Sequence, residues 1–126
     1  MRILIAGGPK TGKTTLSSRL AVLHECQEFH GDDLIGKLEW SESSEEISKW
    51  FGKPGNWIIE GVQIARALRK WLARNDEGLP FDKLYLGRIP KVELSKGQDA
   101  MAKGCFKVFN EILPTLVERN ARIEEF

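Results

Sequence analysis

Long apolar runs and cysteines are scarce in this sequence of 126 residues. No stretch approaches the roughly 18 consecutive apolar residues that a membrane-spanning helix needs, and the first residues do not follow the basic, apolar and small-residue order of a signal peptide. The only cysteines are Cys26 and Cys105, too few for a disulfide framework. These absences argue against a membrane partner and against a secreted disulfide scaffold, so we expect a cytoplasmic protein.

Charge of one sign is also lacking, because 19 basic and 18 acidic residues leave a formal net charge of +1. Without a strong overall field, nucleic acid would have to bind through a local patch. The candidate patch is a set of basic residues at helical spacing, Arg66, Arg69, Lys70 and Arg74. These residues could bind along a nucleic-acid backbone, or they could simply form the solvated face of an amphipathic helix. We favour the solvated face.

Short apolar runs alternate with stretches of helical periodicity along the chain. Three of these runs predict strands, at residues 2–6, 57–59 and 83–87, and the more polar segment at residues 27–30 is a fourth strand candidate. The alternation predicts an α/β fold of three layers, the P-loop NTPase arrangement, with helices on both faces of a short, mainly parallel sheet of about four strands. No repeat or linker divides the sequence, so residues 1–126 are expected to form a single domain.

The expected helices differ in how clearly they are marked. Leucines recur at helical spacing after the first strand, at Leu16, Leu20 and Leu23. Ser43 with Glu46 fits a capping box, which predicts the start of a short helix. A strongly amphipathic helix follows the third strand, with its apolar side chains at Ile64, Leu68, Trp71 and Leu72. From about Ser95 the pattern is helical, and Pro114 either kinks this helix or begins a second one.

The segment GGPKTGKT matches the phosphate-loop pattern G-x-x-x-x-G-K-[ST] in full, between an expected strand and an expected helix. Its glycines let successive main-chain N–H groups turn inward around phosphate oxygens, and the helix adds the positive end of its dipole. Lys13 is expected to reach the β- and γ-phosphates of ATP, and the Thr14 hydroxyl to bind Mg²⁺. The predicted nucleotide-binding residues are Gly7, Gly8, Pro9, Lys10, Thr11, Gly12, Lys13, Thr14 and Thr15.

Acidic residues follow the second and third expected strands, at the edge where a parallel sheet binds ligands. Asp32 and Asp33 end the first of these segments, and a carboxylate there is suited to accept the proton of an acceptor hydroxyl. The sequence leaves open which of the two is the base, and a capped turn is the simpler explanation of the pair. Glu60 is a candidate ligand of Mg²⁺, or else a strand end that faces solvent. With Lys13, these residues form the predicted catalytic set.

The phosphate loop, GDD at residues 31–33 and WIIEG at residues 57–61 together resemble the small P-loop kinases. The likeness is to the branch of uridine kinase, phosphoribulokinase and nicotinamide riboside kinase, and to the P-loop proteins known as DNA topology modulation proteins. It extends over roughly the first 90 residues, and its motifs beyond the phosphate loop are short. The resemblance implies ATP and Mg²⁺ as ligands, Lys13 and Thr14 at the triphosphate, Asp32 as base and Glu60 near the metal or the acceptor.

The lid-like segment at residues 89–104 departs from that resemblance. Such kinases carry an arginine-rich lid after the fourth strand and then a fifth strand, whereas this segment has lysines and no arginine, and no fifth strand is evident. The available cations are Arg88, Lys96 and Lys103. We expect them to serve as a lid, or else to lie on a solvated helix face.

The acceptor site is the part of the expected enzyme that the sequence marks least. Trp40 is a candidate to stack on a planar acceptor, or else packs on a helix, and Arg66 is a candidate ligand of an acceptor phosphate. We predict a kinase that moves the γ-phosphoryl group of ATP to a hydroxyl or phosphate of a small acceptor, nucleoside-like or nucleotide-like. The alternatives are a nucleotide-binding module with slow ATPase activity that regulates a partner, and a polynucleotide kinase.

Overall fold

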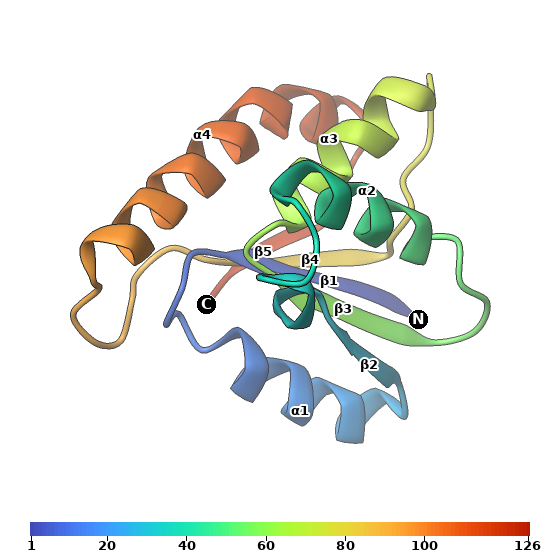
Figure 1. Cartoon of the computed structure of the whole chain (residues 1–126). Helices are drawn as coiled ribbons and strands as arrows, with labels where there is room; N and C mark the ends of the chain where they lie inside the picture. Colours follow the sequence, from blue (N-terminus) through green and yellow to red (C-terminus); the bar gives the residue numbers. More distant parts are fainter.

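A five-stranded parallel sheet forms the middle of the protein in the computed structural model, which describes residues 1–126 (Figure 1). Its strands are β1 (Arg2–Gly7), β2 (Gln27–His30), β3 (Trp57–Gly61), β4 (Lys83–Gly87) and β5 (Ile123–Glu125). Their order across the sheet is β2-β3-β1-β4-β5, and every pairing is parallel. The phosphate loop follows β1, so it leaves the sheet from the middle of the carboxyl edge.

The central strand β1 is buried on both faces, as its continuous apolar run predicts. Its apolar side chains are each at most 1% exposed: Ile3, Leu4, Ile5 and Ala6. Glu60 of β3 lies opposite Ile5, and Gly87 of β4 lies opposite Gly7. The ends of three strands therefore meet beside the first glycine of the phosphate loop.

Four helices cover the two faces of the sheet unequally (Figure 1). One face carries α1 (Lys13–His24), and the other carries α2 (Trp40–Trp50), α3 (Ile64–Arg74) and α4 (Lys96–Glu118). A core cluster of 19 buried residues includes side chains from α2, α3 and α4, and a cluster of 5 includes Leu20 of α1. The predicted three-layer α/β/α fold is confirmed. None of the helices combines the length and the apolar character needed to cross a membrane.

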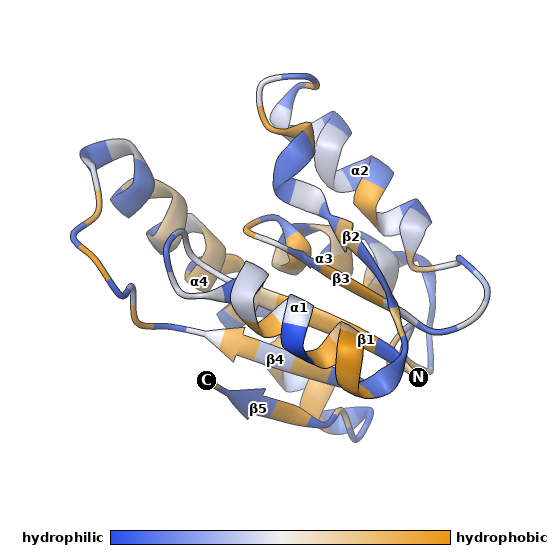
Figure 2. Cartoon of the chain, turned by 90° about the horizontal axis from the view of Figure 1, so that it is seen from below, coloured by the Kyte–Doolittle hydropathy of each residue, from blue (hydrophilic) through white to orange (hydrophobic).

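Helix α1 lies over the sheet on the face seen in Figure 2 and buries only a narrow stripe of its own residues. This stripe runs through Lys13, Ser17 and Leu20, and the hydroxyl of Ser17 donates a hydrogen bond of 2.7 Å to Glu28. Leu23 lies outside the stripe and is 72% exposed. Leucine periodicity therefore predicted the helix but not the whole of its buried face, which includes two polar residues.

Helix α2 begins earlier than the sequence predicts. Ser43 lies inside it and is buried, with its hydroxyl 2.6 Å from Gln63 Oε1 and 3.0 Å from the Trp40 carbonyl oxygen. The predicted capping box at Ser43 and Glu46 is wrong, because Ser43 lies inside the helix and its hydroxyl donates to two oxygens instead of accepting from a main-chain N–H. A capping box is present at Ser95, where α4 begins.

The last third of the chain also differs from the prediction. Helix α4 continues through Pro114, between the buried Ile112 and Leu116, so no second helix begins there. The sheet has a fifth strand, β5, whose residue Ile123 lies opposite Leu84 of β4. This strand has three residues, two of them glutamates, and is too short and too polar to show an apolar run.

Candidate functional site

The phosphate loop is shaped by glycines at its two ends. A Cβ on Gly7 would lie 2.5 Å from the carbonyl oxygen of Gly87, so no side chain fits where β1 and β4 end together. Gly12 has a φ of 94° and forms the N-cap of α1, a backbone conformation in which residues with side chains are strained. Lys10, between them, has a φ of 61°. The loop thus turns sharply and presents its main chain at the first turn of α1.

Lys13 lies inside this loop. Its side chain is buried, with the residue only 5% exposed, and its ammonium group donates a hydrogen bond of 2.7 Å to the Gly8 carbonyl oxygen. The Thr11 hydroxyl donates to the same carbonyl at 3.0 Å. A buried ammonium group without a carboxylate partner is a strong attraction for an anion, because its charge is little screened by water.

A polar cavity of about 320 Å³ opens over the loop. Its lining residues are Pro9, Lys10, Gly12, Lys13, Thr14, Asp32 and Gln98, none of them hydrophobic. The volume is in the range of small-ligand sites, and the lining combines two lysines, one hydroxyl and one carboxylate. The chemistry of this cavity fits a polyphosphate beside a hydrogen-bonding acceptor.

Asp32 and Asp33, which the sequence does not distinguish, differ in the structure. Asp32 lies in the short 3-10 helix Gly31–Leu34, lines the cavity, and accepts a hydrogen bond of 2.9 Å from the Val62 N–H to its Oδ1. Asp33 is exposed and does not line the cavity. The bond to Val62 fixes the carboxylate of Asp32 and leaves Oδ2 for another partner.

Glu60 is buried at the end of β3 and lies outside the cavity lining. Its Oε1 is 2.8 Å from His30 Nδ1, and its Oε2 has no hydrogen-bond partner. Burial raises the pKa of Glu60, while the hydrogen bond from His30 acts in the opposite direction. The alternative in which Glu60 is a strand end facing solvent is therefore wrong.

His30 is a site neighbour that the sequence does not reveal. Burial acts to lower its pKa, but the hydrogen bond to Glu60 and the charges of Glu60, Glu28 and Asp33 outweigh it and raise the pKa of His30 above its usual value. His30 and Glu60 are 30 residues apart and come together because β2 and β3 are adjacent strands. The register of these two strands places His30 directly opposite Glu60, and nothing in the local sequence indicates this pairing.

Helix α4 and the loop before it lie against the phosphate loop. Gln98 lines the cavity, and Ala102 lies so close to Gly8 that a Cβ on that glycine would be 2.9 Å from the alanine methyl. The main-chain N–H of Lys91 donates to the Lys10 carbonyl oxygen at 2.8 Å. The Lys91 ammonium group also lies about 3.0 Å from the place where a Cβ on Gly12 would be. Sequence reasoning missed both Lys91 and Gln98, which carry no motif.

The predicted lid cations lie elsewhere. Arg88 pairs with Glu125 of β5 and lies over the Phe106 ring at 5.8 Å. Lys103 pairs with Asp99 on its own helix at 2.9 Å, and Lys96 is exposed outside the cavity lining. The β4–α4 loop brings Lys91 to the phosphate loop, whereas none of these three residues lines the phosphate cavity, so their role as a lid stays a prediction.

Trp40 and Arg66, the predicted acceptor residues, are in contact with each other. The Arg66 guanidinium carbon lies 5.4 Å from the centroid of the Trp40 ring. The Trp40 carbonyl oxygen accepts a hydrogen bond of 3.1 Å from Gln63 Nε2, which ties the start of α2 to the start of α3. The structure brings these residues together at the carboxyl edge of the sheet but not into the lining of the phosphate cavity.

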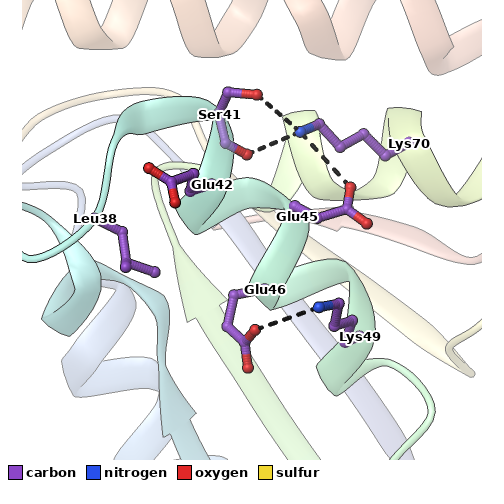
Figure 3. A pocket seen from close by; sticks show the side chains of 7 residues that line it. All are labelled: Leu38, Ser41, Glu42, Glu45, Glu46, Lys49 and Lys70. Carbon is purple, nitrogen blue, oxygen red and sulfur yellow. Dashed lines mark hydrogen bonds and ion pairs between the residues drawn. The ribbon is translucent and has the colours of Figure 1, made fainter.

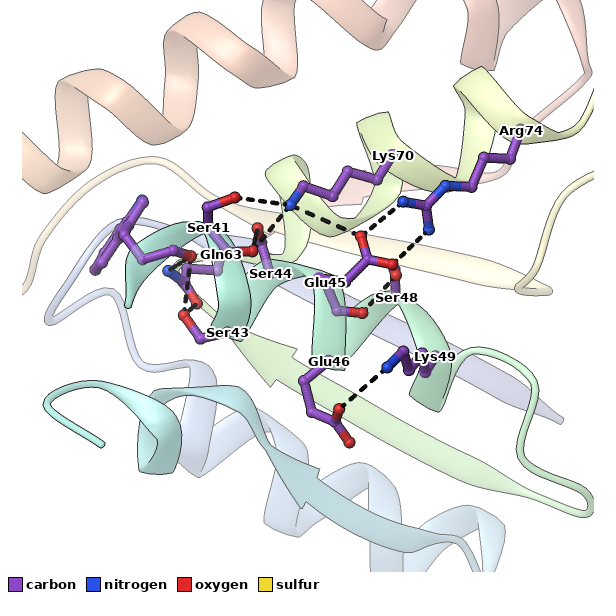
Figure 4. A network of polar contacts seen from close by, with 11 residues as sticks. Ser41, Ser43, Ser44, Glu45, Glu46, Ser48, Lys49, Gln63, Lys70 and Arg74 are labelled. Atoms are coloured by element: carbon purple, nitrogen blue, oxygen red, sulfur yellow. Dashed lines mark hydrogen bonds and ion pairs between the residues drawn. The ribbon is translucent and has the colours of Figure 1, made fainter. Parts of the chain in front are cut away.

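The basic face of α3 is paired with acidic residues (Figure 4). Arg74 makes two hydrogen bonds to the Glu45 carboxylate, of 2.8 and 2.7 Å, and Lys70 donates to the Ser41 carbonyl oxygen at 2.9 Å. Arg69 pairs with Glu111 of α4 at 2.8 Å. Two glutamates and a main-chain carbonyl thus engage three of the four basic residues, which disfavours the nucleic-acid interpretation of this face.

A second and larger cavity, of about 410 Å³, lies beside α2 (Figure 3). Its lining residues are Leu38, Ser41, Glu42, Glu45, Glu46, Lys49 and Lys70. Three glutamates and two lysines make this surface acidic, and it shares no residue with the phosphate cavity. An acidic surface repels a polyphosphate, so its larger volume does not make it the nucleotide site.

Comparison with solved structures identifies the fold. Shikimate kinase from Acinetobacter baumannii in complex with shikimate matches at a TM-score of 0.62 and 11% identity, over 99% of this chain and 82% of that one. Shikimate kinase from Aquifex aeolicus matches at 0.55 and 16% identity, over 98% and 84%. Deoxyadenosine kinase from M. mycoides with bound dATP matches at 0.54 and 13%, over 100% and 90%.

The chain has the fold of a P-loop kinase. The sequence matches no protein-family model and no curated protein. At these identities the likeness shows the architecture alone, so the resemblance to the uridine kinase branch stays a prediction.

Proposed function

We propose that this protein is an ATP-dependent phosphotransferase that moves the γ-phosphoryl group to a hydroxyl or phosphate of a small acceptor. The observation that carries the proposal is that one polar cavity is lined by both the phosphate-loop residues Lys13 and Thr14 and the carboxylate of Asp32. A kinase needs both, because it must bind the triphosphate and also orient the acceptor.

On the donor side, the phosphate loop supplies positive charge without covalent chemistry. Main-chain N–H groups and the first turn of α1 bind the β- and γ-phosphates of ATP, and the Lys13 ammonium group compensates the charge that develops on the migrating phosphoryl. Because Lys13 is buried, this attraction is stronger than the same charge would give in water.

The oxygen donors at the cavity fit Mg²⁺. Thr14 supplies a hydroxyl and Asp32 a carboxylate at the cavity itself, and Glu60 has one buried carboxylate oxygen without a partner. Oxygen ligands of this kind, few in number and supplemented by phosphate and water, are those that Mg²⁺ takes in phosphoryl-transfer enzymes. When bound, the metal neutralises charge on the phosphates. Thr14 and Glu60 are its proposed protein ligands. Thr14 would bind the metal from within the cavity, and Glu60 from just outside the cavity lining.

On the acceptor side, Asp32 is the proposed base. The Val62 N–H fixes Oδ1, which leaves Oδ2 to accept the proton of an acceptor hydroxyl. The hydroxyl oxygen then forms a bond to the γ-phosphorus while the bond to the β–γ bridging oxygen breaks, and ADP leaves. Trp40 and Arg66 are proposed to contact the body of the acceptor.

The test compares Asp32→Asn with Asp33→Asn, a matched pair of adjacent aspartates. We expect Asp32→Asn to lower acceptor-dependent ADP formation at least about 100-fold, the contribution of a general base, with ATP affinity nearly intact. Asp33→Asn should retain the activity, because Asp33 is exposed outside the cavity. The first acceptors to assay are hydroxy acids and nucleosides, which the names of the structural neighbours suggest.

ATP binding is measured separately by the rise in melting temperature with a non-hydrolysable ATP analogue and Mg²⁺, which Lys13→Ala should abolish. Equal ADP formation in both aspartate variants would contradict Asp32 as the base. ATP hydrolysis that no acceptor accelerates would point instead to a slow ATPase module.

A further inference from the structure

Arg66 has an unusual environment among the arginines of this chain. Its Nη1 is buried and has no hydrogen-bond partner, and no other arginine has such an atom. Arg69, Arg74 and Arg88 each pair with a glutamate. A buried guanidinium nitrogen without a partner costs free energy, because it has left water and gained no acceptor in return. Such a group is unexplained by the fold alone.

The surroundings of Arg66 supply no acceptor for that nitrogen. The Trp40 ring lies on one side, and the main chain of α4 lies so close on another that a Cβ on Gly104 would be 2.7 Å from Nη2. Glu111, the acidic residue whose charge acts on Arg66, is already paired with Arg69. Burial lowers the pKa of Arg66. The guanidinium plane is held by packing rather than by an ion pair.

Helix α4 connects Arg66 with the phosphate loop. Ala102 contacts Gly8 of the loop, Gly104 contacts Arg66, and the thiol of the buried Cys105 lies near both the Gly7 N–H and Arg66. Arg66 also follows Val62, whose N–H binds Asp32, by four residues. Arg66 is therefore linked through α4 to the phosphate loop and through the start of α3 to the proposed base.

We infer that the acceptor carries an oxyanion, a carboxylate or a phosphate, and that Arg66 binds it while the hydroxyl lies at Asp32. This inference rests on the proposed function and names its substrate class: an anionic hydroxyl compound rather than a neutral nucleoside or sugar. A guanidinium group offers parallel N–H donors that match the two oxygens of a carboxylate or phosphate. Trp40 supports the guanidinium plane from one face, which prepares it for such a partner.

The test uses pairs of related probes in which only one member carries an anion. The pairs are adenosine 5′-monophosphate with adenosine, thymidine 5′-monophosphate with thymidine, and D-gluconate with D-glucose, each titrated by calorimetry in the presence of a non-hydrolysable ATP analogue and Mg²⁺. We expect at least one anionic member to bind ten-fold or more tightly than its neutral counterpart. Preference in the nucleotide pairs identifies a phosphate, and preference in the gluconate pair identifies a carboxylate.

Three variants assign the preference to Arg66. Arg66→Met keeps the side-chain stem against Trp40 and should abolish the preference for the anionic probe. Arg66→Lys keeps the positive charge but loses the paired N–H donors of the guanidinium group, and should leave a weaker preference. The control Arg74→Met, which removes an exposed arginine of the same helix that is paired with Glu45, should keep it. Arg66→Met should also raise the melting temperature by a few degrees, because it removes a buried group without a partner.

Two results would overturn the inference. One is a panel in which no anionic member binds more tightly than its neutral counterpart. The other is an anion preference that survives in Arg66→Met. The titrations measure binding without phosphoryl transfer, so their outcome is separate from the test of the kinase proposal. Phosphorylation of neutral acceptors that depends on Asp32 would support the kinase proposal and contradict an anion site at Arg66.

Discussion

Individual residues of the phosphate loop contribute through close packing as well as through charge. Gly7 has to be glycine because β1 and β4 end side by side, and the carbonyl oxygen of Gly87 occupies the place of its side chain. Lys13 is buried by the same loop that it helps to close. Stability and phosphate binding are therefore coupled at these positions.

A pair of glycine substitutions measures that coupling. Gly7→Ala should lower the free energy of unfolding by at least about 2 kcal/mol, because the methyl group meets main-chain atoms that cannot move aside, and it should abolish the thermal shift with the ATP analogue. Gly97→Ala, in the first turn of α4 with open space around it, should instead raise that free energy by up to about 1 kcal/mol. Urea unfolding gives both values, and equal effects would contradict the close contact.

Asp32 and Asp33 show what a residue-level prediction can and cannot give. The sequence GDD after an apolar segment identified the pair, because acidic residues at the carboxyl end of a parallel strand face a ligand edge. Their separate roles depend on the bond between Asp32 and Val62, 30 residues later in the chain. No local pattern contains that bond.

At the scale of elements, the segment between β4 and α4 is the part that sequence reasoning described least well. It holds the main chain of Lys91 on the phosphate loop and begins α4 with a capping box at Ser95. The sequence pointed to Arg88, Lys96 and Lys103 as the cations of this segment and did not distinguish Lys91. What decides proximity, however, is the path of the loop, and the main-chain bond from Lys91 to Lys10 fixes that path.

Lys91 is predicted to be the cation of this element that acts on the nucleotide. Lys91→Ala should weaken binding of the ATP analogue by roughly ten-fold, the loss of one charge-assisted contact of about 1.4 kcal/mol. Lys96→Ala and Lys103→Ala are the controls and should bind normally, because Lys103 is paired with Asp99 and neither residue has the main-chain bond that holds Lys91 on the phosphate loop. Calorimetric titration at constant salt measures all three, and a larger loss in either control would restore the original lid prediction.

Helices α2 and α3 are joined by ion pairs on the outer surface of the protein (Figure 4). Glu45 accepts two hydrogen bonds from Arg74 and lies 3.8 Å from Lys70. The hydrogen bond from Arg74, followed by the positive charges of Arg74, Lys70 and Lys49, lowers the pKa of Glu45 below its ordinary value of 4.5. The pair is exposed, so water and salt weaken it.

This geometry predicts a pH-dependent stability difference. A lowered pKa in the folded state stabilises the protein above the ordinary value of 4.5, and the contribution is lost as pH falls through the folded pKa. Glu45→Gln should therefore unfold at a lower urea concentration than the unsubstituted protein at pH 7. The gap should close below pH 4.5, and also in high salt. Glu46→Gln, which loses only a 3.9 Å pair within α2, is the control and should change little.

At the scale of the whole molecule, the strand order β2-β3-β1-β4-β5 creates the site. Placing β1 between β3 and β4 brings the phosphate loop beside Glu60 and Gly87, and placing β2 beside β3 adds His30 and Asp32. The four strand ends and Gln98 of α4 together form the site. The solved kinase structures share this architecture at 11–16% identity, so it tolerates very different sequences.

The sequence by itself determined the α/β class, four of the five strands and the phosphate loop, because each depends on neighbours within a few residues: an apolar run, a helical period, or glycines at fixed spacing. Only the tertiary structure decided that Asp32 rather than Asp33 lines the cavity, that Lys91 lies on the phosphate loop, and that β5 joins the sheet. These features depend on contacts between residues far apart in the chain, and such contacts exist only once the strands have taken their order and register.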